Sequence, residues 1–172
     1  MKNTTNSIRS QENEFKDFIL GAISSVDLSK YNSIELSTDV EDTKYSFDLR
    51  VKTDVKVSVR LRTNKFIKKK DITIRTNNCG HRKSEAEKLI EGEGNLYFYG
   101  FLNSGQTEIV KWCLFDIDKV RPYIKNTYNN IFVKGIKARF ETNGDGSDFM
   151  LIPNSILDKT EAILRKSYNW IV

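Results

Sequence analysis

The chain has 172 residues and a mass of 19.9 kDa, carries a formal net charge of +5, and has 38% hydrophobic and 30% charged residues. Its 10 Phe, 7 Tyr and 2 Trp are too many for a disordered chain, and no stretch approaches the roughly eighteen apolar residues of a membrane span. Two cysteines, Cys79 and Cys113, exclude a disulfide scaffold, and residues 1–11 lack the apolar stretch of a signal peptide. We therefore expect a single cytoplasmic domain over residues 1–172, of which 1–10 are flexible.

The first predicted element is an amphipathic helix over about residues 11–25. Its apolar side chains recur at the spacing of one helix face. They are Phe15, Phe18, Ile19, Ala22, Ile23 and Val26. The polar flank carries Glu12, Glu14 and Asp17, and a short strand at 33–36 is expected to follow.

Residues 45–52 and 55–62 predict a β-hairpin, because both segments alternate strictly between apolar odd positions and polar even positions. A register that keeps the two apolar faces together places Asp48 directly across from Ser58 or Arg60. Asp48 and Arg60 then form either part of a chemical site or a simple cross-strand ion pair.

A third strand is predicted at 71–76, followed by a helix that begins with a capping box of Ser84 and Glu87. Gly92 or Gly94 is expected to end this helix. The expected inward side chains are Ile72 and Ile74 of the strand and Ala86, Leu89 and Ile90 of the helix, with Thr73 and Arg75 pointing outward.

Two aromatic strands, at 95–102 and 108–117, are expected to be buried on both faces. The run Tyr97, Phe98, Tyr99 and Phe101 is accordingly interpreted as core and not as a platform for stacking bases. Asp116 or Asp118 is expected to begin a short helix through Tyr123.

The remaining residues predict a second hairpin and a final helix. The hairpin joins 137–141 to 148–152 through the Asn143-Gly144-Asp145-Gly146 turn. The helix starts after Pro153, is capped by Asn154 or Ser155, and buries Ile156, Leu157, Ile163 and Leu164. The complete order predicts a single α/β domain with a central mixed β-sheet flanked by helices.

Positive charge is concentrated in the middle of the chain. Residues 50–88 contain 13 Lys or Arg against 4 Asp or Glu, a local balance of +9, so the remainder carries −4. Such a region favours a surface that faces a polyanion, although a solvated lysine-rich face would have the same composition. The predicted nucleic-acid-binding residues form two groups. Arg60, Arg62 and Arg75 can bind phosphates in a bidentate manner through the guanidinium group. Lys68, Lys69 and Lys70 form either a phosphate clamp or a solvated loop tip.

Five short segments add a further pattern. They are 42–49 (DTKYSFDL), 87–90 (EKLI), 97–100 (YFYG), 111–116 (KWCLFD) and 143–149 (NGDGSDF). In this order and spacing, from about Glu14 onward, the chain resembles the PD-(D/E)XK nuclease superfamily, and its small phage-type members in particular. The resemblance implies a restriction-endonuclease-like fold and a Mg²⁺-dependent endonuclease that acts on DNA.

The resemblance also implies site residues. Asp48 matches the metal-binding Asp of the superfamily, Glu14 an accessory acid of the first helix, and Arg60 the position of the catalytic Lys. Mg²⁺ would lower the pKa of a water and neutralise the charge of the transition state. The catalytic set predicted in this way is Asp48, Arg60 and Glu14.

The pattern departs from the superfamily at two positions. Ser58 replaces the metal-binding Glu and is no anionic ligand, while Arg60 is always protonated and cannot act as a base. A second acid could come from Asp42, Glu41 or Glu85, and Asp42 with Asp48 is the metal pair we expect. Two functions therefore remain open: an endonuclease, for which a homodimer would supply one site to each strand, and a non-cleaving relative that binds DNA or a host protein, such as a phage inhibitor of a host system.

Overall fold

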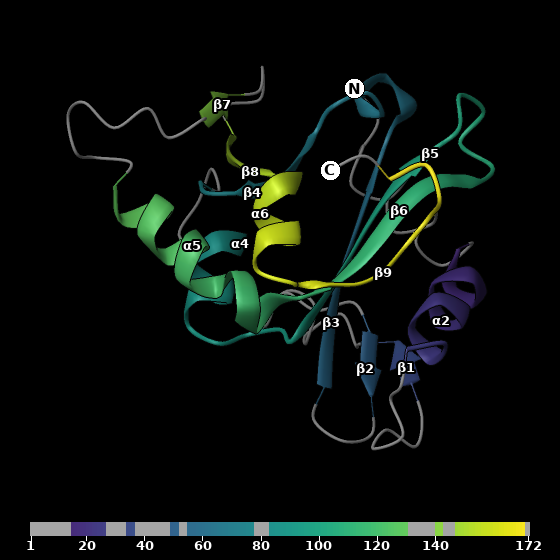
Figure 1. The fold of residues 1–172 in the computed structure, drawn as a ribbon, viewed down its shortest axis with the longest axis horizontal. Coiled ribbons are helices and arrows are strands. Elements are labelled where there is room, and N and C mark those ends of the chain that lie inside the picture. Colours follow the sequence, from purple (N-terminus) through teal and green to yellow (C-terminus); the bar gives the residue numbers. More distant parts are fainter. Residues whose placement is uncertain are drawn as a thin grey trace.

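The computed structural model describes residues 15–26, 34–36, 49–51, 55–77, 83–130, 140–142 and 147–170. These residues form two β-sheets with helices packed against them (Figure 1). The predicted α/β class, with a mixed central sheet flanked by helices, is therefore confirmed. Within the described residues, no helix is both long and apolar enough to cross a membrane.

The central sheet has six strands in the order β1-β2-β3-β5-β6-β9. Their bounds are β1 Ile34–Leu36, β2 Leu49–Val51, β3 Val55–Arg62, β5 Leu96–Leu102, β6 Ile109–Asp116 and β9 Ile163–Lys166. Strands β3 and β5 are parallel, and the other neighbours are antiparallel. The parallel pair requires a long connection, and this connection contains one strand of the second sheet and a helix.

The second sheet has the order β4-β8-β7, with strands β4 (Asp71–Arg75), β7 (Phe140–Thr142) and β8 (Asp148–Pro153). The predicted second hairpin is confirmed where it is described, because 140–142 pair antiparallel with 148–150. Strand β4 does not extend the first hairpin. It pairs instead with β8, which lies far away in the sequence.

Helices cover both faces of the central sheet (Figure 1). They are α2 (Lys16–Ser24), α4 (Glu85–Ile90), α5 (Ile117–Asn129) and α6 (Asn154–Lys159), with a 3-10 turn η1 at Asn64–Phe66. Helix α2 packs on one face, and the other three helices pack with the second sheet on the opposite face. The site described below lies at this second interface, between the two sheets.

Strand β5 is the centre of both cores and is buried along its whole length, as predicted. Its even positions face α2, where Phe98 stacks on Trp112 with ring centroids 5.6 Å apart. Its odd positions face the second sheet, where Tyr97 stacks on Phe115 at 5.2 Å. A strand that is buried on both faces typically consists of consecutive apolar residues, which is the pattern that predicted this burial.

Two helices end differently from the prediction. Helix α5 begins at the predicted cap Asp116, whose side chain accepts a hydrogen bond from the Asp118 N–H at 2.9 Å, but it continues past Pro122 to Asn129 instead of ending near Tyr123. Its buried positions Ile117, Val120 and Ile124 explain this length, because they keep one face on the core beyond the proline.

The predicted final helix is shorter than expected. Helix α6 ends at Lys159, and Glu161 with a φ of 52° turns the chain, so that Ile163 and Leu164 form strand β9 and not a helix face. The predicted side-chain cap is also wrong. Pro153 occupies the cap position without a side-chain bond, and Asn154 is buried inside the first turn.

Helix α2 confirms the predicted stripe in part. Phe15, Ile19 and Ile23 are buried, whereas Phe18 is 44% exposed and makes an edge contact with Trp112. The part of the predicted helix before Phe15 lies outside the described residues.

The predicted capping box at the start of α4 is confirmed. The Ser84 N–H donates to Glu87 Oε2 at 2.6 Å, and the Glu87 N–H donates to Ser84 Oγ at 3.3 Å. The first of these bonds lowers the pKa of the Glu87 carboxyl, because it stabilises the charged form. Gly92, with a φ of 95°, follows the last turn, as the predicted stop requires.

Replacing Ser84 by Ala is expected to lower the free energy of unfolding by about 1 kcal/mol, because one partly buried N–H of the first turn loses its acceptor. Urea denaturation followed by circular dichroism measures the change. Ser104→Ala, in an exposed loop, is the matched control and should leave the unfolding midpoint unchanged. Equal midpoints for the two variants would contradict the role assigned to the cap.

Candidate nucleic-acid interface

Three arginines surround one aromatic ring between the two sheets. Arg60 and Arg62 come from β3, Arg75 ends β4, and Phe149 lies near the start of β8. The guanidinium carbons lie 5.1, 5.8 and 5.6 Å from the Phe149 ring centroid, in the order Arg60, Arg62 and Arg75. The structure thus brings together the three arginines that the sequence singles out, in an environment where guanidinium groups are attracted to an aromatic ring.

Glu85, at the first position of α4, ties this arginine cluster to both sheets. Its Oε2 accepts hydrogen bonds from Arg60 Nη1 at 2.5 Å and from the Arg75 backbone N–H at 2.9 Å. Its Oε1 accepts a hydrogen bond from the Tyr97 hydroxyl. The carboxylate therefore links β3, β4 and β5. The Arg75 N–H that it binds lies on the edge of β4, where no other strand pairs among the described residues.

The ion pair between Arg60 and Glu85 is largely buried. The side chains of Arg60 and Glu85 are only 16% and 18% exposed. Burial alone would lower the pKa of the Arg60 guanidinium, but the charge of Glu85 and the neighbouring tyrosine hydroxyls raise that pKa above its ordinary value. Burial also raises the pKa of the Tyr97 hydroxyl well above its usual range, and the Glu85 charge adds to this shift, so the hydroxyl stays a donor.

These contacts test whether Glu85 could be the second metal-binding acid. Both of its oxygens already accept bonds from Arg60, Arg75 and Tyr97, so a Mg²⁺ ion would have to displace a buried cation. Glu85 does not fit the role of a ligand. The other predicted acids, Asp48, Asp42, Glu41 and Glu14, lie outside the described residues. Within the described part of the chain, no group of three or more His, Cys, Asp or Glu could hold a metal ion.

The hairpin of β2 and β3 has the predicted register. Leu49 pairs with Val57 and Val51 with Val55, so odd positions of β2 pair with odd positions of β3. Ser58, which stands where a metal-binding Glu is expected, is buried with 4% of its surface exposed.

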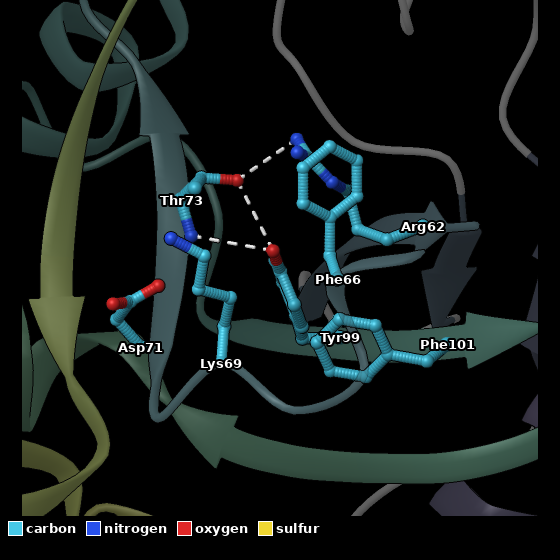
Figure 2. Close-up of a pocket in the computed structure, with 7 residues that line it drawn as sticks. All are labelled: Arg62, Phe66, Lys69, Asp71, Thr73, Tyr99 and Phe101. Carbon is cyan, nitrogen blue, oxygen red and sulfur yellow. Dashed lines mark hydrogen bonds between the residues drawn. The ribbon is translucent and has the colours of Figure 1, made fainter. Parts of the chain in front are cut away.

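Beside the arginine cluster lies a small hollow with a polar floor (Figure 2). Its lining residues are Arg62, Phe66, Lys69, Asp71, Thr73, Tyr99 and Phe101. Arg62 Nη1 donates to Thr73 Oγ1 at 3.1 Å, and that oxygen lies 3.1 Å from the Tyr99 hydroxyl. The Thr73 backbone N–H donates to the same Tyr99 hydroxyl at 3.3 Å. The hollow has about 10 Å³ for the centre of a water-sized group, which excludes a buried nucleotide or cofactor.

The basic loop, which we define as residues 63–70, forms the outer rim of this hollow. All of its lysines are exposed, namely Lys65, Lys68, Lys69 and Lys70. The loop backbone is nevertheless fixed. Lys111 Nζ donates to the Ile67 carbonyl at 2.8 Å, and the Asn154 N–H donates to the Lys70 carbonyl at 2.9 Å. The loop therefore presents several positive charges from a constrained backbone.

Lys111 is an anchor of the basic loop that the sequence did not reveal. It lies on β6, is 3% exposed, and its ammonium group lies 5.4 Å from the Phe101 ring and 5.3 Å from the Trp170 ring. Burial lowers the pKa of the Lys111 ammonium. Charge patterns in the sequence do not distinguish such a buried anchor from a surface lysine. The sequence likewise does not distinguish Phe149 from an ordinary core residue.

The predicted exposure of the arginine row is wrong. Arg60, Arg62 and Arg75 are partly buried between the sheets and do not form an open phosphate-tracking face, and Thr73 is buried instead of pointing outward. The reason is that Thr73 contacts Arg62 of β3 and Tyr99 of β5 on one face of β4, while Ile72 and Ile74 belong to the core on the other face. The exposed positive charge of the described residues in this area belongs to the basic loop.

Comparisons with known proteins found no match. No family model matches the chain, and neither a curated protein nor a solved structure was found that matches it.

Proposed function

We propose that this chain is a cytoplasmic nucleic-acid-binding protein that grips the phosphate backbone of DNA through the basic loop. The observation that carries the proposal is the combination of four exposed lysines with a backbone held by Lys111 and Asn154. A constrained basic segment binds a polyanion with less loss of conformational freedom than a mobile one. The concentration of 13 basic residues between positions 50 and 88 supports the same function.

The partly buried arginine cluster has a supporting role in this proposal. Arg60 is neutralised by Glu85, whereas Arg62 and Arg75 add positive potential behind the loop. Charges under a surface attract a polyanion over about a Debye length, roughly 10 Å at 0.1 M salt. The cluster thus adds to the attraction of phosphate toward the basic loop.

We do not extend the proposal to cleavage. The Mg²⁺-dependent endonuclease implied by the resemblance rests on Asp48, Asp42 and Glu14, and Glu85 does not fit as their partner. We therefore propose a DNA-binding regulator, and the cleavage assay below distinguishes it from the endonuclease. A homodimer and a host protein as an additional partner stay open within it.

The test is equilibrium binding of the full chain to a fluorescein-labelled 20-base-pair duplex, to the matching single strand and to the same sequence in RNA. Between 50 and 200 mM salt, the affinity for the duplex should fall steeply, with a slope of about −0.9 for each phosphate contact. Affinity that does not depend on salt would overturn the proposal.

The same mixtures, incubated with Mg²⁺ or Mn²⁺, measure cleavage of linear and branched DNA. We expect binding without cleavage. Cleavage that is lost in Asp48→Ala would replace the regulator by the endonuclease, whereas cleavage unchanged in Asp48→Ala would indicate a contaminating nuclease.

A further inference from the structure

The hollow behind the basic loop contains a hydroxyl proton without an acceptor. The hydroxyls of Thr73 and Tyr99 share one mutual hydrogen bond, in which either oxygen can donate. The other two bonds at these oxygens come from Arg62 and from the Thr73 backbone N–H, both of which are donors. One of the two hydroxyl protons therefore takes no part in the hydrogen bonds found among the described residues.

This donor is buried, which makes the missing acceptor significant. Tyr99 is 1% and Thr73 7% exposed. An unpaired buried donor costs free energy, so the hollow is suited to an oxygen atom that enters it and accepts. The room of about 10 Å³ accommodates one such oxygen and not a whole ligand.

The charges around the hollow select the class of ligand. In Figure 2 the side chains of Arg62 and Lys69 lie on either side of the two hydroxyls, and Asp71 lies at the edge. Two cations and one carboxylate give a lining charge of +1. A phosphodiester carries one negative charge and balances this lining, whereas a terminal phosphate monoester carries about −1.5 to −2 at pH 7 and exceeds it.

We infer that the hollow formed by Arg62, Lys69, Thr73 and Tyr99 is the seat of one phosphodiester group of the bound strand. One non-bridging oxygen enters the hollow and accepts from the spare hydroxyl, while the guanidinium and the ammonium hold the group at the mouth. This inference rests on the proposed function and adds that the contacts along the basic loop are unequal, because only Lys69 of its lysines lines the hollow.

The test titrates the ¹⁵N-labelled full chain with dimethyl phosphate, the smallest phosphodiester monoanion, and follows amide shifts by NMR. Saturable shifts are expected at Phe66, Lys69 and Thr73. Lys69→Gln should weaken the binding of dimethyl phosphate about ten-fold, because it removes one charged hydrogen bond. Lys68→Gln is the matched control, since Lys68 is also exposed but does not line the hollow, and it should change affinity by less than about two-fold.

A second variant is expected to strengthen the binding of phosphate. Asp71→Asn raises the lining charge to +2, so it should strengthen binding several-fold and shift the preference toward methyl phosphate. Loss of structure does not produce tighter binding, so this result separates a site from a folding defect. Equal effects of Lys68→Gln and Lys69→Gln, or the absence of saturable shifts, would overturn the inference and assign the hollow to water.

The proposed function and the inferred phosphodiester site can be disproved independently. If the duplex binds with a salt-dependent affinity but dimethyl phosphate does not saturate the hollow, the seat is wrong and the proposed function stands. If dimethyl phosphate saturates the hollow but no oligonucleotide binds, the nucleic-acid function is wrong.

Discussion

Replacing Glu85 by Ala is expected to lower the free energy of unfolding by about 3–5 kcal/mol, because Arg60 is left buried without its counter-ion. The Arg75 backbone N–H and the Tyr97 hydroxyl lose their acceptor at the same time. Urea unfolding, followed by far-ultraviolet circular dichroism, measures the difference.

Two further variants identify the cause of that loss. Glu91→Ala breaks an ion pair with Lys83 whose partners are 45% and 57% exposed, and it should cost less than about 1 kcal/mol. Combining Glu85→Ala with Arg60→Met removes the stranded charge and should restore part of the stability. If Glu85→Ala costs no more than Glu91→Ala, the carboxylate is not the link between the sheets.

Local patterns in the sequence were sufficient to predict most of the elements. Strict alternation predicts β3 and its pairing with residues 49–51, because the period of a strand decides which side chains share a face. The Ser84 and Glu87 spacing predicts the start of α4 for a similar reason, since the capping box is complete within four residues.

Contacts between distant segments were not predictable in this way. Strand β4 was expected to have one exposed face, but Thr73 on that face is covered by Arg62 of β3 and Tyr99 of β5. The alternation of Ile72 and Ile74 predicts a strand but does not predict which sheet that strand joins. Likewise, Leu164 has the apolar character of a helix face, and only the turn at Glu161 moves it into a strand.

The candidate site was predictable in its residues and not in its geometry. Charge counting selects Arg60, Arg62 and Arg75, and the structure does bring them together around Phe149. Their burial depends on Glu85, whose partner cannot be read from spacing because 25 residues separate it from Arg60. The exposed lysines of the basic loop consequently become the better targets for a binding experiment.

Replacing those lysines by Gln is expected to abolish measurable binding of DNA at physiological salt. If Lys65, Lys68, Lys69 and Lys70 each contact one phosphate, the slope of log K against log salt falls in magnitude by about 3–4 units, and affinity at 0.1 M salt falls about a thousand-fold. Binding of the labelled duplex across a salt series measures both quantities.

A matched variant separates position from net charge. Lys16, Lys119, Lys125 and Lys159 are partly or fully exposed on α2, α5 and α6, and their replacement by Gln removes the same four charges from elements outside the basic loop. This second variant should change the slope by less than about one unit, because charges that do not contact the bound phosphates act only through the screened potential. Both variants should unfold at the urea concentration of the parent protein, since surface charges contribute little to stability. Equal slopes for the two variants would mean that DNA senses only the total charge of +5, and the basic loop would lose its assigned role.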